Sequence, residues 1–233
     1  MLRSAGATGR DSPPTIVYSA LVDVLSLLRD AVVIAASFLI GGIPWGVIVA
    51  RLSGGPDPRT VGSGRTGGSN VMRALGPRLA LLSGLLDAAK GSVAVLIAWA
   101  VGGGAGLAVF AAMAAVIGHS RSIFMGFHGG RGVAPSWGAL LVLQPWIAVV
   151  ITPLFAGVIL ITRYSSLGSL VGTAGAGVLL AITTAVVPLD PWLYAYAVGG
   201  PILIFAFHHD NIARLLAGKE RKIGTPKTEP PAP

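Results

Sequence analysis

Residues 62–70, GSGRTGGSN, have the composition of an anion-binding loop and are followed by Arg73. Glycines allow successive backbone N–H groups to converge on an anion, and the guanidinium of Arg73 matches the oxygens of a phosphate group. Ser69 or Asn70 is placed to cap a helix beginning near Val71, whose N-terminus favours negative charge. The segment therefore predicts a phosphate-binding site.

A second segment, residues 118–133, carries the same chemistry in different residues. Four of the seven residues from 126 to 132 are glycine, and His128 and Arg131 stand among them. Such a loop can approach a phosphate group closely and brings cationic side chains to it. It predicts a second loop that contributes to the same phosphate-binding site.

Two polar side chains towards the C-terminus, His208 and Asn211, lie at helical spacing and share one face with Leu215. A basic, hydroxyl-rich corner lies at residues 163–166, RYSS. Each feature also has an ordinary structural interpretation. Glycine-rich turns often only connect helices, and a histidine at a membrane boundary is often just an interfacial residue.

Two charged residues, Asp87 and Lys90, interrupt an apolar run at residues 79–101. Ionisable groups inside a membrane segment are candidates for function. Because their i,i+3 spacing puts them on one helix face, we favour an ion pair that fixes helix packing, with Lys90 facing the site.

The composition places these residues in a membrane protein. Of the 233 residues, 53% are hydrophobic and 11% charged, and the mean hydropathy is +0.76. Average soluble domains carry about 25% charged residues, so a soluble enzyme, a disordered chain and a nucleic-acid-binding domain are excluded despite a pI near 10.6. The chain has no cysteine and no cluster of metal ligands, so we expect no metal and no cofactor.

The apolar runs predict an all-α integral membrane protein with seven transmembrane helices. About 20 apolar residues cross the hydrocarbon core. Residues 133–162 are uncharged but too long for one span. We expect Gln144-Pro145 to divide them, because proline is disfavoured in the interior of a helix. The expected spans are residues 31–50, 79–101, about 104–118, two within 133–162, 167–187 and 191–207.

Basic residues gather on one side of this arrangement. The segments 51–78, 119–132, 163–166 and 208–233 hold 13 Lys and Arg, whereas the loops opposite hold none. Basic loops stay in the cytoplasm, so we expect the N-terminus outside and the C-terminus inside. The glycine-rich loops, the serine corner and the His/Asn helix then share one membrane face, which favours the functional interpretation.

The chain divides into three expected parts. Residues 1–30 form an N-terminal extension without signal-peptide features, in which residues 15–28 are either an interfacial amphipathic helix or a poorly ordered segment. Residues 31–207 form the seven-helix domain. Residues 208–233 carry the cytoplasmic His/Asn motif and a proline-rich tail that we expect to be disordered.

The three polar segments resemble those of the bacterial acyl-phosphate-dependent glycerol-3-phosphate acyltransferase family. Its signatures look like SGNIGATN followed by Arg, GHxxPxFxxFKGGKGVAT, and HxxNIxRLxxGxE. The chain resembles them at residues 63–73, 118–134 and 208–220. Further agreements are Gly42-Ile43-Pro44, Leu86-Asp87 with Lys90-Gly91, and Arg163-Tyr164 with Ser166-Leu167. The resemblance covers roughly residues 38–224 in the family's order.

The resemblance implies seven transmembrane helices and transfer of a fatty acyl group from acyl phosphate to the sn-1 hydroxyl of glycerol 3-phosphate. The products would be lysophosphatidic acid and phosphate, made in a bacterial cell membrane by a multi-pass enzyme whose site faces the cytoplasm. By resemblance, the catalytic residues are Ser63, Arg73, His208 and Asn211. The substrate-binding residues are Asn70, Lys90, Gly129, Gly130, Arg131, Gly132 and Ser166.

We expect the reaction at such a site to need no strong general base. No histidine is followed five positions later by aspartate, so the HxxxxD pair of soluble-type acyltransferases is absent. Acyl phosphate is already an activated mixed anhydride. We therefore expect catalysis by positioning and charge neutralisation, with His208 or a substrate phosphate receiving the hydroxyl proton.

Several residues depart from the family signatures at the expected phosphate site. Arg65 stands in place of Asn, and His128 and Arg131 stand in place of two lysines. These departures leave two alternatives open: acylation of another phosphorylated polyol and a non-catalytic lipid-binding paralogue. The polytopic fold and the Asp87/Lys90 pair leave a third open, a small transporter. The transporter is the least favoured, because the polar residues gather at one membrane face.

Overall fold

A computed structural model describes residues 14–224, and every regular element in that range is helical, as the sequence predicts. The α-helices are α1 (Pro14–Gly42), α2 (Trp45–Leu52), α3 (Gly68–Leu75), α4 (Pro77–Ala100), α5 (Gly104–Ser120), α6 (Val133–Leu143), α7 (Pro145–Thr162), α8 (Ser165–Val186), α9 (Trp192–Phe207) and α10 (His209–Leu216). Short 3₁₀ helices occupy Pro58–Thr60 and Ile123–Met125.

Seven of these helices are apolar, and five segments are long enough to cross a membrane. The five are Tyr18–Gly42, Pro77–Ala100, Gly104–Met125, Pro145–Thr162 and Ser165–Val186. α6 and α9 are apolar but shorter, with 11 and 16 residues. The expected turns at Gln144-Pro145 and at residues 188–191 both separate helices, since proline begins or precedes the next helix at each.

The expected first span, residues 31–50, is wrong as a single helix. α1 begins 17 residues earlier and ends at Gly42, and α2 forms a separate helix after it. Pro44 has no backbone N–H to donate, so a hydrogen bond of the helical ladder is missing where the two helices separate.

The break between α1 and α2 leaves carbonyl groups that side chains satisfy. Ser122 Oγ donates to the Gly42 carbonyl at 2.5 Å, and Lys90 Nζ donates to the Ile43 carbonyl at 2.9 Å. A helix break inside a membrane protein is tolerated when neighbouring side chains replace the lost hydrogen bonds. These two bonds fix the break, and with it the start of α2, to α4 and to the loop after α5.

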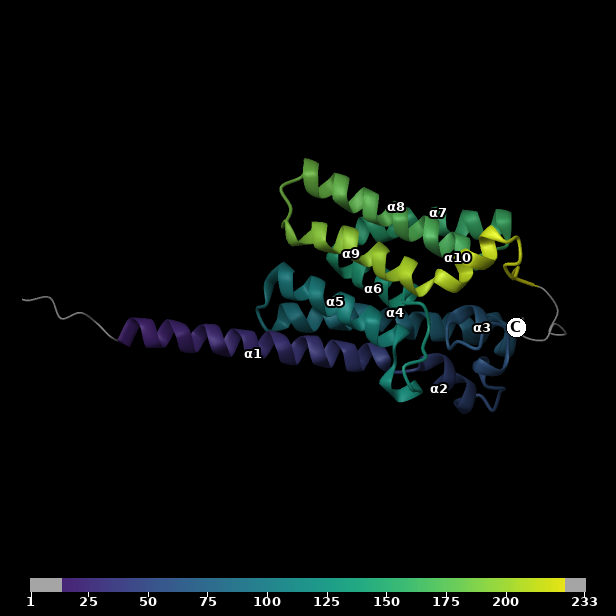
Figure 1. The fold of residues 1–233 in the computed structure, drawn as a ribbon, viewed down its shortest axis with the longest axis horizontal. Coiled ribbons are helices and arrows are strands. Elements are labelled where there is room, and N and C mark those ends of the chain that lie inside the picture. The colour runs from purple at the N-terminus through teal and green to yellow at the C-terminus, as the bar shows by residue number, and fades with distance from the viewer. Residues whose placement is uncertain (1–13, 225–233) are drawn as a thin grey trace, which may run out of the picture.

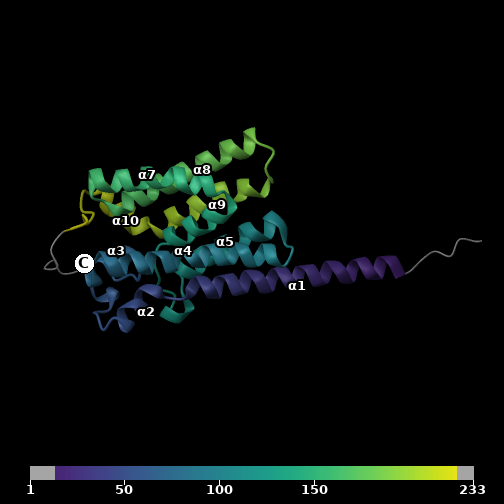
Figure 2. The same ribbon diagram turned by 180° about the vertical axis from the view of Figure 1, so that it is seen from behind.

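α1 runs continuously through the expected boundary at residue 30, so the segment 15–28 is the first half of a long helix. Figures 1 and 2 show this half projecting beyond the other helices. Its large apolar side chains, such as Leu21 and Leu28, are exposed. Its place at a membrane interface stays a prediction, and the expected disordered tail from residue 225 lies outside the described residues.

The helices pack as successive rows, in which α1 lies beside α4 and α5, then α6 and α9, then α7 and α8 (Figure 1). α2, α3 and α10 lie together at one end of the bundle in both views. The polar segments found in the sequence therefore meet at that end.

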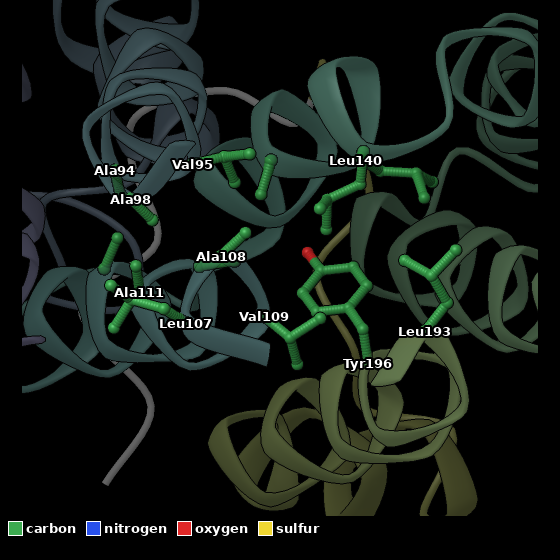
Figure 3. Close-up of a cluster of buried hydrophobic side chains, with 14 of the residues drawn as sticks. Ala94, Val95, Ala98, Leu107, Ala108, Val109, Ala111, Leu140, Leu193 and Tyr196 are labelled. Atoms are coloured by element: carbon green, nitrogen blue, oxygen red, sulfur yellow. The ribbon is translucent and has the colours of Figure 1, made fainter. Parts of the chain in front are cut away.

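Small residues bring the central helices close together. The core of α4 and α5 is rich in alanine, including Ala94, Ala98 and Ala111 (Figure 3). An added Cβ on Gly91 would collide with the backbone of Pro135, so α4 and α6 pack backbone to backbone. This contact sets the start of α6, and the loop before it, against the middle of α4.

Candidate active site

The first glycine-rich loop leads into α3 without a side-chain cap. α3 begins at Gly68 and its N-cap is Gly67, so the prediction that Ser69 or Asn70 caps the helix is wrong. Ser69 Oγ instead donates to Ser165 Oγ on α8 at 3.0 Å, because both side chains face the same space. The hydroxyl joins the first loop to α8.

Asn70 organises this loop from a buried position. Its Nδ2 donates to Ser63 Oγ at 3.2 Å and to the Arg65 carbonyl at 2.9 Å. Its Oδ1 accepts from Arg73 Nη1 at 3.2 Å. One amide thus fixes Ser63 and Arg73 relative to each other, which the sequence pattern did not specify.

The second glycine-rich loop rests on His119, the penultimate residue of α5. The N–H of Gly130 donates to the His119 carbonyl at 3.0 Å, and the N–H of Gly129 donates to the Ser120 carbonyl at 3.2 Å. An added Cβ on Gly130 would collide with the His119 imidazole. Gly132 has a φ of 80°, a conformation that glycine adopts without strain.

Beneath this loop lies a buried group of Asp87, Lys90 and His119. Lys90 Nζ lies 2.7 Å from Asp87 Oδ1 and 3.0 Å from His119 Nδ1. The predicted ion pair is therefore present, and it joins α4 to α5 directly under the glycine loop. Asp87 and His119 line the cavity described below, whereas Lys90 does not.

Glu220 gathers three polar side chains at the end of the third segment. Its Oε1 accepts from Asn211 Nδ2 at 2.6 Å and from Ser166 Oγ at 2.9 Å, and its Oε2 accepts from Arg214 Nε at 2.8 Å. Glu220 and Arg214 were not predicted as site residues from the sequence. Their only signal was their position in the third signature.

Asp210 lies among arginines from three segments. Arg131 Nη2 lies 2.9 Å from Asp210 Oδ2, Arg214 Nη2 lies 3.3 Å from the same oxygen, and Arg65 Nη2 lies 3.8 Å from Oδ1. Burial alone would raise the pKa of Asp210, but Arg131, Arg65 and Arg214 lower it to about 2. The carboxylate is therefore charged at neutral pH and holds the arginines together.

His208 is buried at the junction of α9 and α10. Its Nδ1 lies 2.8 Å from the Ile204 carbonyl. Because a carbonyl oxygen can only accept, Nδ1 carries the proton and Nε2 has a lone pair. Burial, reinforced by Arg131, lowers the pKa of His208 to about 4, so the ring is neutral at pH 7.

These segments surround one cavity of about 600 Å³. The expected site residues that line it are Ser63, Asn70, Arg73, Gly130, Arg131, Gly132, Ser166 and His208. Asn211 lines an adjoining recess together with Ser63, Arg73 and Arg131. Lys90 and Gly129 lie outside both linings, and His128 is exposed away from them.

The cavity is polar at one end and apolar at the other. Ser63, Arg73 and Arg131 line the polar end, and leucines and aromatic residues of α4, α6, α7, α8 and α9 line the rest. Burial lowers the pKa values of Arg73 and Arg131, but arginine stays protonated at neutral pH. Within residues 14–224, no group of His, Cys, Asp or Glu is arranged to hold a metal ion.

Comparison with known proteins connects this cavity to a family. A sequence model described as glycerol-3-phosphate acyltransferase matches residues 31–218. Glycerol-3-phosphate acyltransferase 3 of Dehalococcoides mccartyi is 41% identical over 208 residues, which are 82% of this chain and 94% of the relative. A glycerol-3-phosphate acyltransferase of Thermus thermophilus is 45% identical over 189 residues, with 81% of this chain and 92% of the relative covered.

The fold is similar to that of a solved enzyme, PlsY (YgiH), an integral membrane glycerol 3-phosphate acyltransferase. Its glycerol 3-phosphate form matches with a TM-score of 0.76 and 34% identity, covering 84% of this chain and 96% of that one. Its lysophosphatidic acid form matches with a TM-score of 0.75 and 33% identity over the same shares.

Proposed function

The chain belongs to the glycerol-3-phosphate acyltransferase family and is a multi-pass membrane acyltransferase, and we propose that its acyl donor is an acyl phosphate. It transfers the acyl group to the sn-1 hydroxyl of glycerol 3-phosphate and gives lysophosphatidic acid and phosphate. The relatives named above support this acceptor and this product.

A cationic recess joins an apolar cavity, and this arrangement supports the proposed donor and acceptor most strongly. Two arginines, Arg73 and Arg131, and the hydroxyl of Ser63 border both spaces. Both substrates carry phosphate, and only the donor carries a long apolar chain. A phosphate at the polar end therefore places the donor's carbonyl carbon where the two spaces meet.

The polar end offers groups for a phosphate and for hydroxyls. Among the described residues, Arg131 Nε and Asn211 Oδ1 are buried polar atoms without a hydrogen-bond partner. We assign Arg131 Nε, together with Arg73, to phosphate oxygens, because charge-assisted bonds to phosphate are strong. Asn211 Oδ1 then accepts from an acceptor hydroxyl.

His208 is a weaker base than the substrate itself. Its pKa of about 4 lies below the second pKa of a phosphate monoester, which is about 6. We therefore assign the hydroxyl proton to a substrate phosphate and give His208 Nε2 the role of orienting the hydroxyl. The hydroxyl oxygen bonds to the carbonyl carbon, the bond from that carbon to the phosphate oxygen breaks, and phosphate leaves with the proton.

The donor is tested by comparing palmitoyl phosphate with palmitoyl coenzyme A in lipid nanodiscs, with lysophosphatidic acid measured by mass spectrometry. We expect product from palmitoyl phosphate alone, and we expect Arg73→Ala to abolish it. Arg78→Ala is the matched control, because Arg78 is exposed and lies outside the cavity lining. Product from the thioester at an equal rate would contradict the proposed donor.

We propose seven transmembrane spans in a bacterial plasma membrane, with the site facing the cytoplasm. The excess of Lys and Arg at the end of the bundle that carries α3 and α10 supports this orientation. Since the native chain lacks cysteine, Pro188→Cys and Lys219→Cys each give a single labelling site. In intact spheroplasts, an impermeant thiol reagent should label only the first; labelling of the second alone would reverse the orientation.

A further inference from the structure

On α6, α8 and α9, the cavity-lining residues farthest from the polar end are three buried side chains, and we take them as the end of the apolar part. These are Leu140 on α6, Leu180 on α8 and Tyr196 on α9, each no more than 4% exposed. Figure 3 shows the Tyr196 ring among Leu140, Val109 and Leu193. Val109 and Leu193 belong to the hydrophobic core but not to the cavity lining, so the cavity stops where that core begins.

Tyr196 is held firmly in this position. Its hydroxyl donates to the Ser136 carbonyl at 2.9 Å and lies 3.1 Å from Ser136 Oγ. Its ring lies against Gly200 one turn later on α9, where a Cβ would sit 3.8 Å from the ring carbon Cζ. A buried phenol whose hydroxyl is satisfied keeps one orientation. The ring is therefore a rigid part of the cavity floor.

The distance from the polar end to this floor follows from helix geometry. Leu180 lies 14 residues after Ser166 on α8, which is about 21 Å at 1.5 Å per residue. Tyr196 lies 12 residues before His208 on the other wall, which is about 18 Å. An extended chain advances about 1.2 Å per bond, judged from the reach of an extended backbone. The cavity therefore has room for about 16 carbons.

The side opening of the cavity lies nearer its polar end. Leu81 and Leu85 of α4 line the cavity and are 65% and 56% exposed, so we infer that the cavity opens beside them. They lie within about 12 Å of the start of α4. An acyl chain can therefore enter from the bilayer beside these residues, while its tail reaches the enclosed part.

We propose that Tyr196, positioned by Ser136, ends the acyl site and sets the preferred donor at about 16 carbons. The inference rests on the proposed function, because it assigns the apolar cavity to the acyl chain of the donor. Longer chains must displace a fixed ring or bend out of the cavity. Shorter chains leave apolar surface at the floor unfilled, and each methylene in such a site changes kcat/KM by about tenfold or more.

The test is the chain-length profile of kcat/KM with acyl phosphates of 10 to 20 carbons in nanodiscs. Tyr196→Ala should raise the ratio of the 20-carbon to the 16-carbon donor by about tenfold. Tyr196→Phe keeps the ring and should keep the wild-type cut-off. Tyr194→Ala is the matched control, since Tyr194 is exposed and outside the lining.

A second variant tests the site from the opposite direction. Ala176 lines the cavity ten residues after Ser166, about 15 Å along α8. Ala176→Phe should move the cut-off down to about 12 carbons, even if Tyr196→Ala fails to fold. An unchanged profile in the folded variants would overturn the inference and mean that the tail leaves through the side opening. Absence of turnover by the wild-type protein with every acyl phosphate would instead overturn the proposed function.

Discussion

Lowering the pH from 7 to 5 is expected to destabilise the folded protein through His208. Burial holds the pKa of His208 at about 4 in the folded state, against an ordinary value of 6.5. Between these values the unfolded state binds more protons than the folded state. Stability therefore falls as the pH falls through this range.

The magnitude follows from the two pKa values. At about 1.36 kcal/mol per pKa unit, the full loss is about 3 kcal/mol below pH 4. Between pH 7 and pH 5 the loss is about 2 kcal/mol, because the unfolded imidazole is almost fully protonated at pH 5 while the folded one is not. Asp210, with a pKa of about 2, contributes little in this window because it stays charged.

The assay is chemical denaturation of the purified protein in detergent at pH 7 and at pH 5. The quantity compared is the difference between the two unfolding free energies, measured in the wild type and in His208→Asn. We expect the change in unfolding free energy between pH 7 and pH 5 to be about 2 kcal/mol smaller in the variant than in the wild type. His209→Asn is the matched control, because His209 is exposed. An equal pH dependence in wild type and His208→Asn would show that buried His208 does not cause the loss of stability.

Three further predictions concern the groups around the cavity. Glu220→Gln removes the charge that pairs with Arg214. We expect kcat/KM for glycerol 3-phosphate to fall about 30-fold, equivalent to about 2 kcal/mol. Wild-type kinetics in this variant would show that Glu220 does not position the site. Gly130→Ala adds a methyl group that collides with the His119 imidazole, so activity should fall about 100-fold. Gly157→Ala is the control and should keep wild-type activity, because open space surrounds Gly157. Equal activities of the two variants would contradict the close packing of Gly130. Lys90→Met removes the lysine partner of buried Asp87, which keeps only His119 Nδ1 nearby, at 3.5 Å. Denaturation should show a loss of about 3–5 kcal/mol. Unchanged stability would mean that the ion pair has no structural role.

The sequence predicted the helical class because apolar runs of sufficient length have few alternatives in a membrane. It missed the break in the first span, although Pro44 was visible. Whether a proline breaks or only kinks a membrane helix depends on donors for the carbonyls it leaves, and these came from Ser122 and Lys90, far along the chain.

The predicted site residues gather because their segments all lie at one end of the bundle. What joins them could not be predicted from spacing, since it depends on contacts between distant segments. Asn70 was expected to cap a helix and instead fixes Ser63 and Arg73. Glu220 was a motif residue without an assigned role and instead holds Ser166 and Asn211 in place.

The sharpest test of the proposed donor and acceptor is phosphate release from palmitoyl phosphate by the purified protein, measured with and without glycerol 3-phosphate. We expect phosphate release to depend on the acceptor and to equal the lysophosphatidic acid formed. Arg73→Ala should abolish this release, and Arg78→Ala should preserve it. Release that is indifferent to glycerol 3-phosphate, or equal in the wild type and Arg73→Ala, would contradict the proposed donor and acceptor.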